Sequence, residues 1–114
     1  MANRITIRKS AGTWAVRAGG AVLGETQNAL ELSEEGYPPM IYFPREDIAM
    51  AFLDRTDKST HCPYKGDANY FSVVTKSQTL ENAVWTYESP LEDVTAIKDH
   101  LAFYVGEFLT IEHL

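Results

Sequence analysis

The sequence has one cysteine and no long apolar segment. A single cysteine cannot form an internal disulfide, and no apolar run approaches the roughly 20 residues that a membrane-spanning helix needs. The first ten residues, MANRITIRKS, carry charge but precede no apolar stretch, so we predict no secretion signal. Together these absences predict a cytoplasmic protein with no membrane partner.

Basic residues are also scarce, with ten against 16 acidic residues and a net charge of -6. Proteins that bind nucleic acid gain much of their affinity from lysine and arginine displacing counterions around phosphates. An acidic chain without a basic cluster therefore predicts no nucleic-acid partner. The same charge disfavours adsorption to anionic membranes.

Metal-ligating residues are few and scattered. A structural zinc site needs four cysteine or histidine ligands in paired spacing. Cys62 and the three histidines, His61, His100 and His113, form no such pairs. We therefore predict neither a metal site nor a cofactor.

The pattern of apolar residues predicts a mostly β protein. A chain of 114 residues is long enough for one domain, 1–114, and too short for two ordinary ones. Alternation of apolar and polar residues predicts strands in RITIRK, ALELS, MIYF, ANYFSVV, NAVWTYE and AFYVGEFLTI. TWAVRAGGAVL predicts a hairpin, because Gly19 and Gly20 supply the backbone angles of a two-residue turn.

Two segments predict short helices. REDIAMAFL has two acids near its start, Glu46 and Asp47, that suit a helix N-terminus, and it places Ile48, Ala51 and Phe52 on one face. SPLEDVTAIKDHL has Ser89 as a capping residue and Glu92 in a capping box. Between them DRTDKST predicts a polar loop. The expected fold is α+β and mostly β: a curled antiparallel sheet or open barrel with two short helices.

Four motifs together carry a family resemblance: YFPREDI, THCPYKGDANYFSV, AVWTYESP and LAFY, with the hairpin RAGGAVLGET near the start. In order and spacing they resemble the bacterial family called domain of unknown function 427. The resemblance implies a small β-rich, β-tent-like domain. A nucleotidyltransferase label is sometimes attached to this family, but the acids Glu46, Asp47, Asp54 and Asp57 follow no glycine-serine turn of the kind that chemistry uses.

Arg45 and Lys65 are candidate ligand-binding cations. Each follows a proline-containing turn, FPR or CPYK, and lies beside tyrosines in the sequence. Two cations on rigid turns can grip a carboxylate or phosphate, and the planar fork of arginine favours bidentate contact. The alternative is structural: Arg45 pairs with an acid such as Asp47, and Lys65 is solvated.

Aromatic residues supply the candidate walls of a pocket. Trp85 and Tyr87 are predicted to share a strand face with Ala83, which leaves room beside two large rings for a planar ligand. Tyr42, Tyr70 and Tyr104 could complete the wall with hydroxyl groups. Each of these rings has an alternative role in ordinary core packing.

Cys62 is the candidate nucleophile, because a nearby cation such as Lys65 favours the thiolate. The alternative is a buried cysteine that acts as a small hydrophobe. We therefore predict first a small-molecule-binding domain with an aromatic pocket and a cationic clamp for an anionic or polar planar ligand. The other hypotheses are an enzyme centred on Cys62 and a protein-interaction module.

Overall fold

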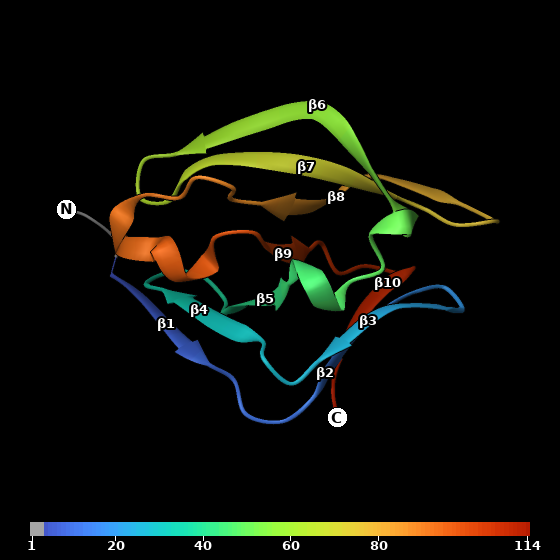
Figure 1. The fold of residues 1–114 in the computed structure, drawn as a ribbon, viewed down its shortest axis with the longest axis horizontal. Coiled ribbons are helices and arrows are strands. Elements are labelled where there is room, and N and C mark those ends of the chain that lie inside the picture. Colours follow the sequence, from blue (N-terminus) through green and yellow to red (C-terminus); the bar gives the residue numbers. More distant parts are fainter. Residues whose placement is uncertain (1–3) are drawn as a thin grey trace.

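A computed structural model describes residues 4–114, which form two antiparallel sheets (Figure 1). The large sheet has seven strands in the order β1-β4-β5-β9-β8-β7-β6, and the small sheet has the order β10-β2-β3. The strands are β1 (Ile5–Lys9), β2 (Trp14–Ala18), β3 (Ala21–Thr26), β4 (Leu30–Glu34), β5 (Met40–Pro44), β6 (Leu53–Cys62), β7 (Gly66–Val74), β8 (Thr79–Thr86), β9 (His100–Phe103) and β10 (Leu109–His113). The prediction of a mostly β, antiparallel and unclosed architecture is confirmed.

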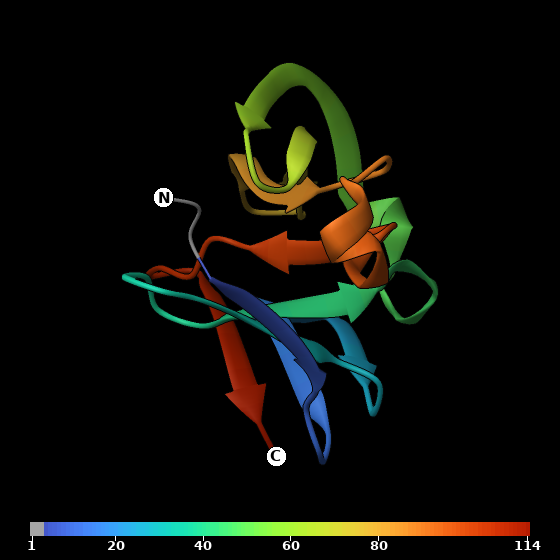
Figure 2. The ribbon, with the colours of Figure 1, turned by 90° about the vertical axis from the view of Figure 1, so that its left-hand side faces the viewer.

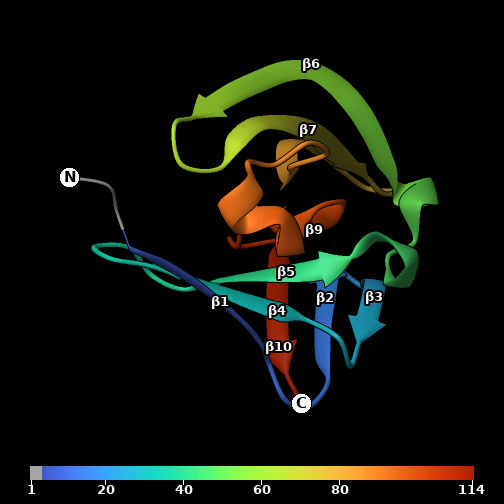
Figure 3. The ribbon, with the colours of Figure 1, turned by 60° about the vertical axis from the view of Figure 1, so that its left-hand side comes forward.

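The large sheet curls, so that its two ends face each other. In Figures 2 and 3, β6 and β7 arch over one side while β1, β4 and β5 lie on the other. Register shifts interrupt the pairing of β6 with β7 and of β7 with β8. Irregularities of this kind bend a strand and increase its twist, which accounts for the arch.

Side-chain alternation in the central strands divides the interior into two cores. Tyr70 of β7 lies opposite Trp85 of β8, which lies opposite Ala102 of β9, and these three belong to one core. The next row, Phe71, Val84 and Phe103, belongs to the other core. Because successive residues of a strand point to opposite faces, the same strands build both cores.

The first core joins the central strands to the small sheet, and the second lies inside the curl. Val16 and Leu23 of the small sheet pack with Phe43 and Leu101 in the first core. Val94 and Ile97 close the second core from the segment between β8 and β9. The cleft described below opens on this second core.

The two predicted helices are present only as short 3-10 segments. Within residues 4–114 the helical segments are all 3-10: η1 (Arg45–Asp47), η2 (Met50–Phe52) and η3 (Glu92–Ile97). Ile48 interrupts the first predicted helix because its backbone forms a bridge to Gly24 of β3 and the N–H of Ala49 donates to the Leu23 carbonyl at 2.8 Å. Pairing with the neighbouring sheet has overridden the helical pattern.

The predicted cap at Ser89 is also wrong. The residue that precedes η3 is Leu91, and no side chain caps the segment. The N–H of Leu91 donates to the Lys65 carbonyl at 2.9 Å, so this stretch packs on the turn that follows β6 instead of starting a helix at Pro90. Gly66 follows in this turn with a φ of +111°, a backbone conformation that favours glycine.

Two further predictions need correction. DRTDKST is not a loop but part of β6, which pairs only with β7 and forms an exposed edge of the sheet. Charged side chains are tolerated in this strand because most of it faces solvent. They also discourage the edge from pairing with a strand of another molecule. AFYVGEFLTI is not one strand: a turn at residues 104–108 separates β9 in the large sheet from β10 in the small sheet.

Gly24 should be sensitive to the smallest substitution. A side chain at this position would overlap the Asp47 carbonyl oxygen and crowd Ile48. We expect Gly24→Ala to lower the free energy of unfolding by about 1–3 kcal/mol, as overpacking does elsewhere. Urea denaturation measures this. The control is Gly20→Ala, where nothing lies within 4 Å, and equal effects of the two variants would contradict the prediction.

Candidate functional site

A cleft of about 640 Å³ opens on the second core. It is formed by β4, the β4–β5 turn, β5, the end of β6 and the turn after it, parts of β7 and β8, and the residues that directly follow β8 and β9. Its lining includes all but one of the predicted site residues: Tyr42, Cys62, Lys65, Tyr70, Trp85, Tyr87 and Tyr104. Ligand pockets for small molecules commonly have volumes of roughly 300–1,000 Å³.

Trp85 is the centre of the aromatic wall. Its ring centroid lies 4.5 Å from that of Tyr104, with the planes tilted by 49°. Tyr42 meets it edge-on at 6.5 Å, and the indole Nε1 donates to the Tyr42 hydroxyl at 3.2 Å. Trp85 and Tyr42 are buried, whereas Tyr104 is 52% exposed. The wall therefore has a fixed base and one ring at the mouth.

The room beside Trp85 does not come from Ala83. Ala83 packs in the first core, on the other side of the central strands. The small residue paired with Trp85 on the cleft side is Ala102 of β9. Asn82 has a positive φ of 52°, and β8 pairs irregularly with β7 just before Val84, so the simple alternation expected from Ala83 to Tyr87 does not hold.

Tyr70 links the rings to the arch of β6. Its hydroxyl is 2.9 Å from the Thr60 hydroxyl, and the Lys58 ammonium lies 4.7 Å from the ring centroid. Partial burial, and then a hydrogen bond with Tyr70, raise the pKa of Tyr104. These contacts hold Tyr70 and Tyr104 together on one side of the cleft.

Tyr42 and Tyr87 keep their protons over the ordinary pH range. Burial raises the pKa of Tyr42 to about 12, against a weaker opposing effect of its hydrogen bond with Trp85. Burial also raises the pKa of Tyr87, and the charge that Tyr42 would carry raises it further. Both phenols are therefore neutral hydrogen-bond donors in the cleft.

Lys65 enters the cleft already paired. Its ammonium donates to Glu34 Oε1 at 2.8 Å, and the two side chains are only 13% and 11% exposed. Lys65 is therefore largely buried and paired, not solvated as the alternative prediction had it. The pair adds polar groups to the cleft without adding net charge.

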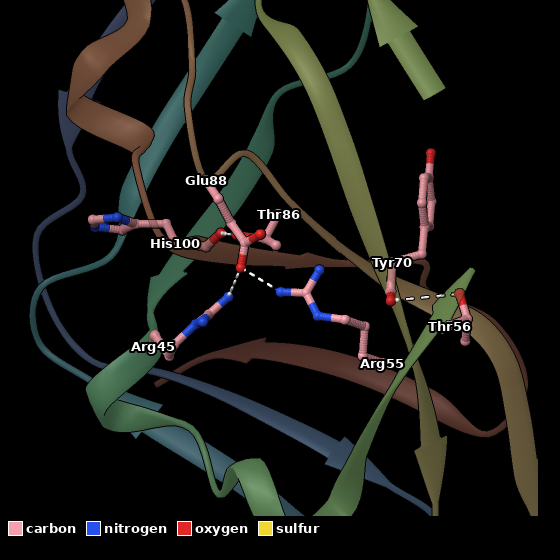
Figure 4. A network of polar contacts seen from close by, with 7 residues as sticks. All are labelled: Arg45, Arg55, Thr56, Tyr70, Thr86, Glu88 and His100. Carbon is pink, nitrogen blue, oxygen red and sulfur yellow. Dashed lines mark hydrogen bonds and ion pairs between the residues drawn. The ribbon is translucent and has the colours of Figure 1, made fainter. Parts of the chain in front are cut away.

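Arg45 is the predicted site residue that does not line the cleft. Its guanidinium donates to Glu88 at 3.2 Å, and Arg55 donates to the same carboxylate (Figure 4). Both guanidiniums lie over the Phe71 ring, 5.6 and 5.2 Å from its centroid. Phe71 belongs to the core opposite the one that contains Tyr70, so the two predicted cations do not face one hollow.

Cys62 is half-buried at the end of β6, and its carbonyl accepts from the Lys65 N–H at 3.2 Å in the turn. The neighbouring His61 is largely exposed and pairs with Asp67 across the hairpin at 2.7 Å. Among the described residues no side chain is hydrogen-bonded to the Cys62 thiol. A nucleophile activated by an adjacent base is therefore not assembled here.

Glu34 and the rim residues Tyr37 and Tyr64 were not among the predicted site residues. Glu34 ends the alternating segment at β4, which is a weak signal, and its partner Lys65 is 31 residues away along the chain. The distance between two residues in sequence gives no sign that a curled sheet brings them together.

The family model described as domain of unknown function (DUF427) matches residues 6–112. The chain belongs to this family. Among curated proteins, none matches the sequence. In the described part of this DUF427 chain, no three histidine, cysteine or acidic side chains are grouped so as to hold a metal ion, and no helix has the length and apolar character to span a membrane.

Removing one partner of the ion pair in the cleft should destabilise the protein strongly. Lys65→Met removes the cation beside the largely buried Glu34 carboxylate, so we expect the free energy of unfolding to fall by about 3 kcal/mol. Glu34→Leu combined with Lys65→Met should recover much of that loss. Chemical denaturation of both variants measures it, with the exposed Lys76→Met as control. A loss in Lys65→Met no larger than in the control would contradict this.

The Arg45–Glu88–Arg55 cluster should make stability depend on acid pH. Partial burial raises the pKa of Glu88, but hydrogen bonds and charges of Arg55 and Arg45 outweigh it and lower the pKa below 4.5. A carboxyl whose pKa is lower in the folded than in the unfolded state stabilises the fold at pH values above its unfolded pKa. This stabilisation is lost as the pH falls through its folded pKa.

We therefore expect Glu88→Gln to reduce the free energy of unfolding at pH 7 by about 1 kcal/mol, a modest effect because the group is partly exposed. The difference from the wild type should shrink progressively below about pH 4.5. Urea denaturation at pH 7 and in acid measures this. A difference that stays constant over the whole range would show that the ionised carboxylate is not responsible.

Proposed function

We propose that this protein is a small-molecule-binding domain whose cleft takes a planar ligand against Trp85. The observation that carries the proposal is the cleft of about 640 Å³, which six tyrosines and one tryptophan line. Planar ligands gain affinity from offset stacking and edge contacts with such rings. The likeness to a β-tent fold, single-domain organisation and a cytoplasmic location remain predictions.

Ordinary core packing explains part of the aromatic cluster but not all of it. Tyr42, Trp85 and Tyr87 are buried in the second core, as packing requires. Tyr104 is half-exposed and nevertheless rests against Trp85 at 4.5 Å. A large ring at a cleft mouth, tilted against a buried indole, offers a surface on which a ligand ring can stack.

The charge of the cleft favours a polar ligand over a strongly anionic one. Among the residues that the structure describes, Lys65 is the only lysine or arginine in the cleft lining, and Glu34 already offsets its charge. Arg45 is engaged by Glu88 elsewhere. The proposed site therefore keeps the aromatic floor and Lys65 of the sequence prediction but has no two-cation clamp.

An enzyme centred on Cys62 is the second candidate, because the thiol lines the same cleft. Its chemistry would need a thiolate near neutral pH. Rates of alkylation with iodoacetamide across pH, compared with a model thiol, test this directly. Alkylation no faster than the model thiol would remove the nucleophile from this hypothesis.

A screen of planar fragments by thermal shift tests the binding proposal. A fragment at a hundredfold excess over its Kd adds about 2.7 kcal/mol of stability. We expect Tyr104→Ala to weaken binding about twofold to tenfold, because an aromatic contact contributes roughly 0.5–1.5 kcal/mol. Phe108→Ala is the control, since Phe108 is similarly exposed and does not line the cleft.

Since Tyr104 is half-exposed, its truncation should leave the fold intact, which circular dichroism checks. Hits whose affinity is the same in wild type, Tyr104→Ala and Phe108→Ala bind elsewhere. If every hit behaves in this way, the cleft is not the binding site.

A further inference from the structure

The Tyr87 hydroxyl is a buried donor that lacks a partner. The residue is only 6% exposed, and no side chain or backbone group among the described residues hydrogen-bonds to its hydroxyl. The oxygen is not among the fully enclosed, unpaired polar atoms, so it opens to the cleft that Tyr87 lines. Buried tyrosine hydroxyls usually have a partner, and one left open in a cleft indicates that the partner comes from outside.

Tyr42 offers a second donor close to the first. Its hydroxyl oxygen accepts from the Trp85 indole, which directs the phenolic proton away from that contact. No acceptor for this proton occurs among the described residues. Tyr42 and Tyr87 belong to the same core and line the same cleft. Both stay protonated, because their pKa values are raised.

Lys65 offers a third donor. An ammonium group has three N–H bonds, and one of them is directed to Glu34. The remaining donors lie in a cleft where the positive charge is already offset. The cleft is therefore rich in hydrogen-bond donors and nearly neutral in charge.

We propose that the cleft recognises the carbonyl oxygen of an uncharged planar ring compound, which accepts hydrogen bonds from Tyr87, Tyr42 and Lys65. This inference rests on the proposed function and names the chemical class of its ligand. A carbonyl oxygen has two lone pairs and satisfies several donors without bringing a charge into the cleft. A carboxylate would bring an uncompensated negative charge near Glu34, and an ammonium group would meet the Lys65 charge and have no lone pair for the phenols.

Four probes that share one ring separate these possibilities: benzamide, benzoate, benzylammonium and toluene. Ligand-observed NMR gives the Kd of each for the full chain at pH 7. We expect benzamide to bind at least about fivefold more tightly than the other three, since a hydrogen bond contributes roughly 0.5–1.5 kcal/mol.

Tyr87→Phe keeps the ring and removes only the hydroxyl. We expect it to weaken benzamide binding about fivefold to tenfold, to leave toluene binding unchanged, and to leave the urea midpoint unchanged or raised, because the hydroxyl has no partner to lose. Thr110→Val is the control: it removes a hydroxyl from an exposed residue of β10 outside the cleft and should not change any of the four affinities.

The outcomes distinguish this inference from the function on which it rests. Equal affinities for all four probes, or benzamide binding that survives Tyr87→Phe, would overturn carbonyl recognition and leave an aromatic binding cleft. Tighter binding of benzoate or benzylammonium would overturn it in favour of an anionic or cationic ligand. If no probe binds, both the ligand class and the proposed function fail.

Discussion

The structure depends on the alternation of side chains in the central strands of the large sheet, which the irregular pairing before Val84 interrupts at Ala83. Tyr42 and Phe43, Tyr70 and Phe71, and Val84 and Trp85 are neighbours in the chain, but each pair is divided between two cores. One face of the large sheet packs against the small sheet, and the other face lies inside the curl, where the cleft opens. A shift of one residue in register would exchange the two faces, so the core and the cleft are specified by the same constraint.

The polar groups of the molecule follow this division. On the cleft side the Lys65–Glu34 pair joins the turn after β6 to the end of β4, across the opening of the curl. On the other side Glu88 gathers Arg45 and Arg55 over Phe71. Each cation thus pairs with an acid on its own side of the sheet, so two residues in similar sequence motifs have different surroundings.

Much of the fold was predictable because strands and tight turns leave local signals. The Gly19-Gly20 hairpin, the strand that ends at Pro44 and the turn between Cys62 and Gly66 are each encoded by a few neighbouring residues. The errors arose where long-range pairing overrides local pattern. Ile48 bridges to β3 instead of continuing a helix, Leu91 bonds to the Lys65 carbonyl, and the charged DRTDKST segment is stable as an edge strand.

By itself, the sequence determined which residues alternate, where the chain must turn, and which aromatic and cationic side chains were available for a site. Only the tertiary structure decided which of them share a space. It places Lys65 with the tyrosines and Trp85 and separates Arg45 from them. Their partners, Glu34 and Glu88, lie 31 and 43 residues away in the chain. The curl of the sheet creates such distant contacts, and no short stretch of sequence encodes that curvature.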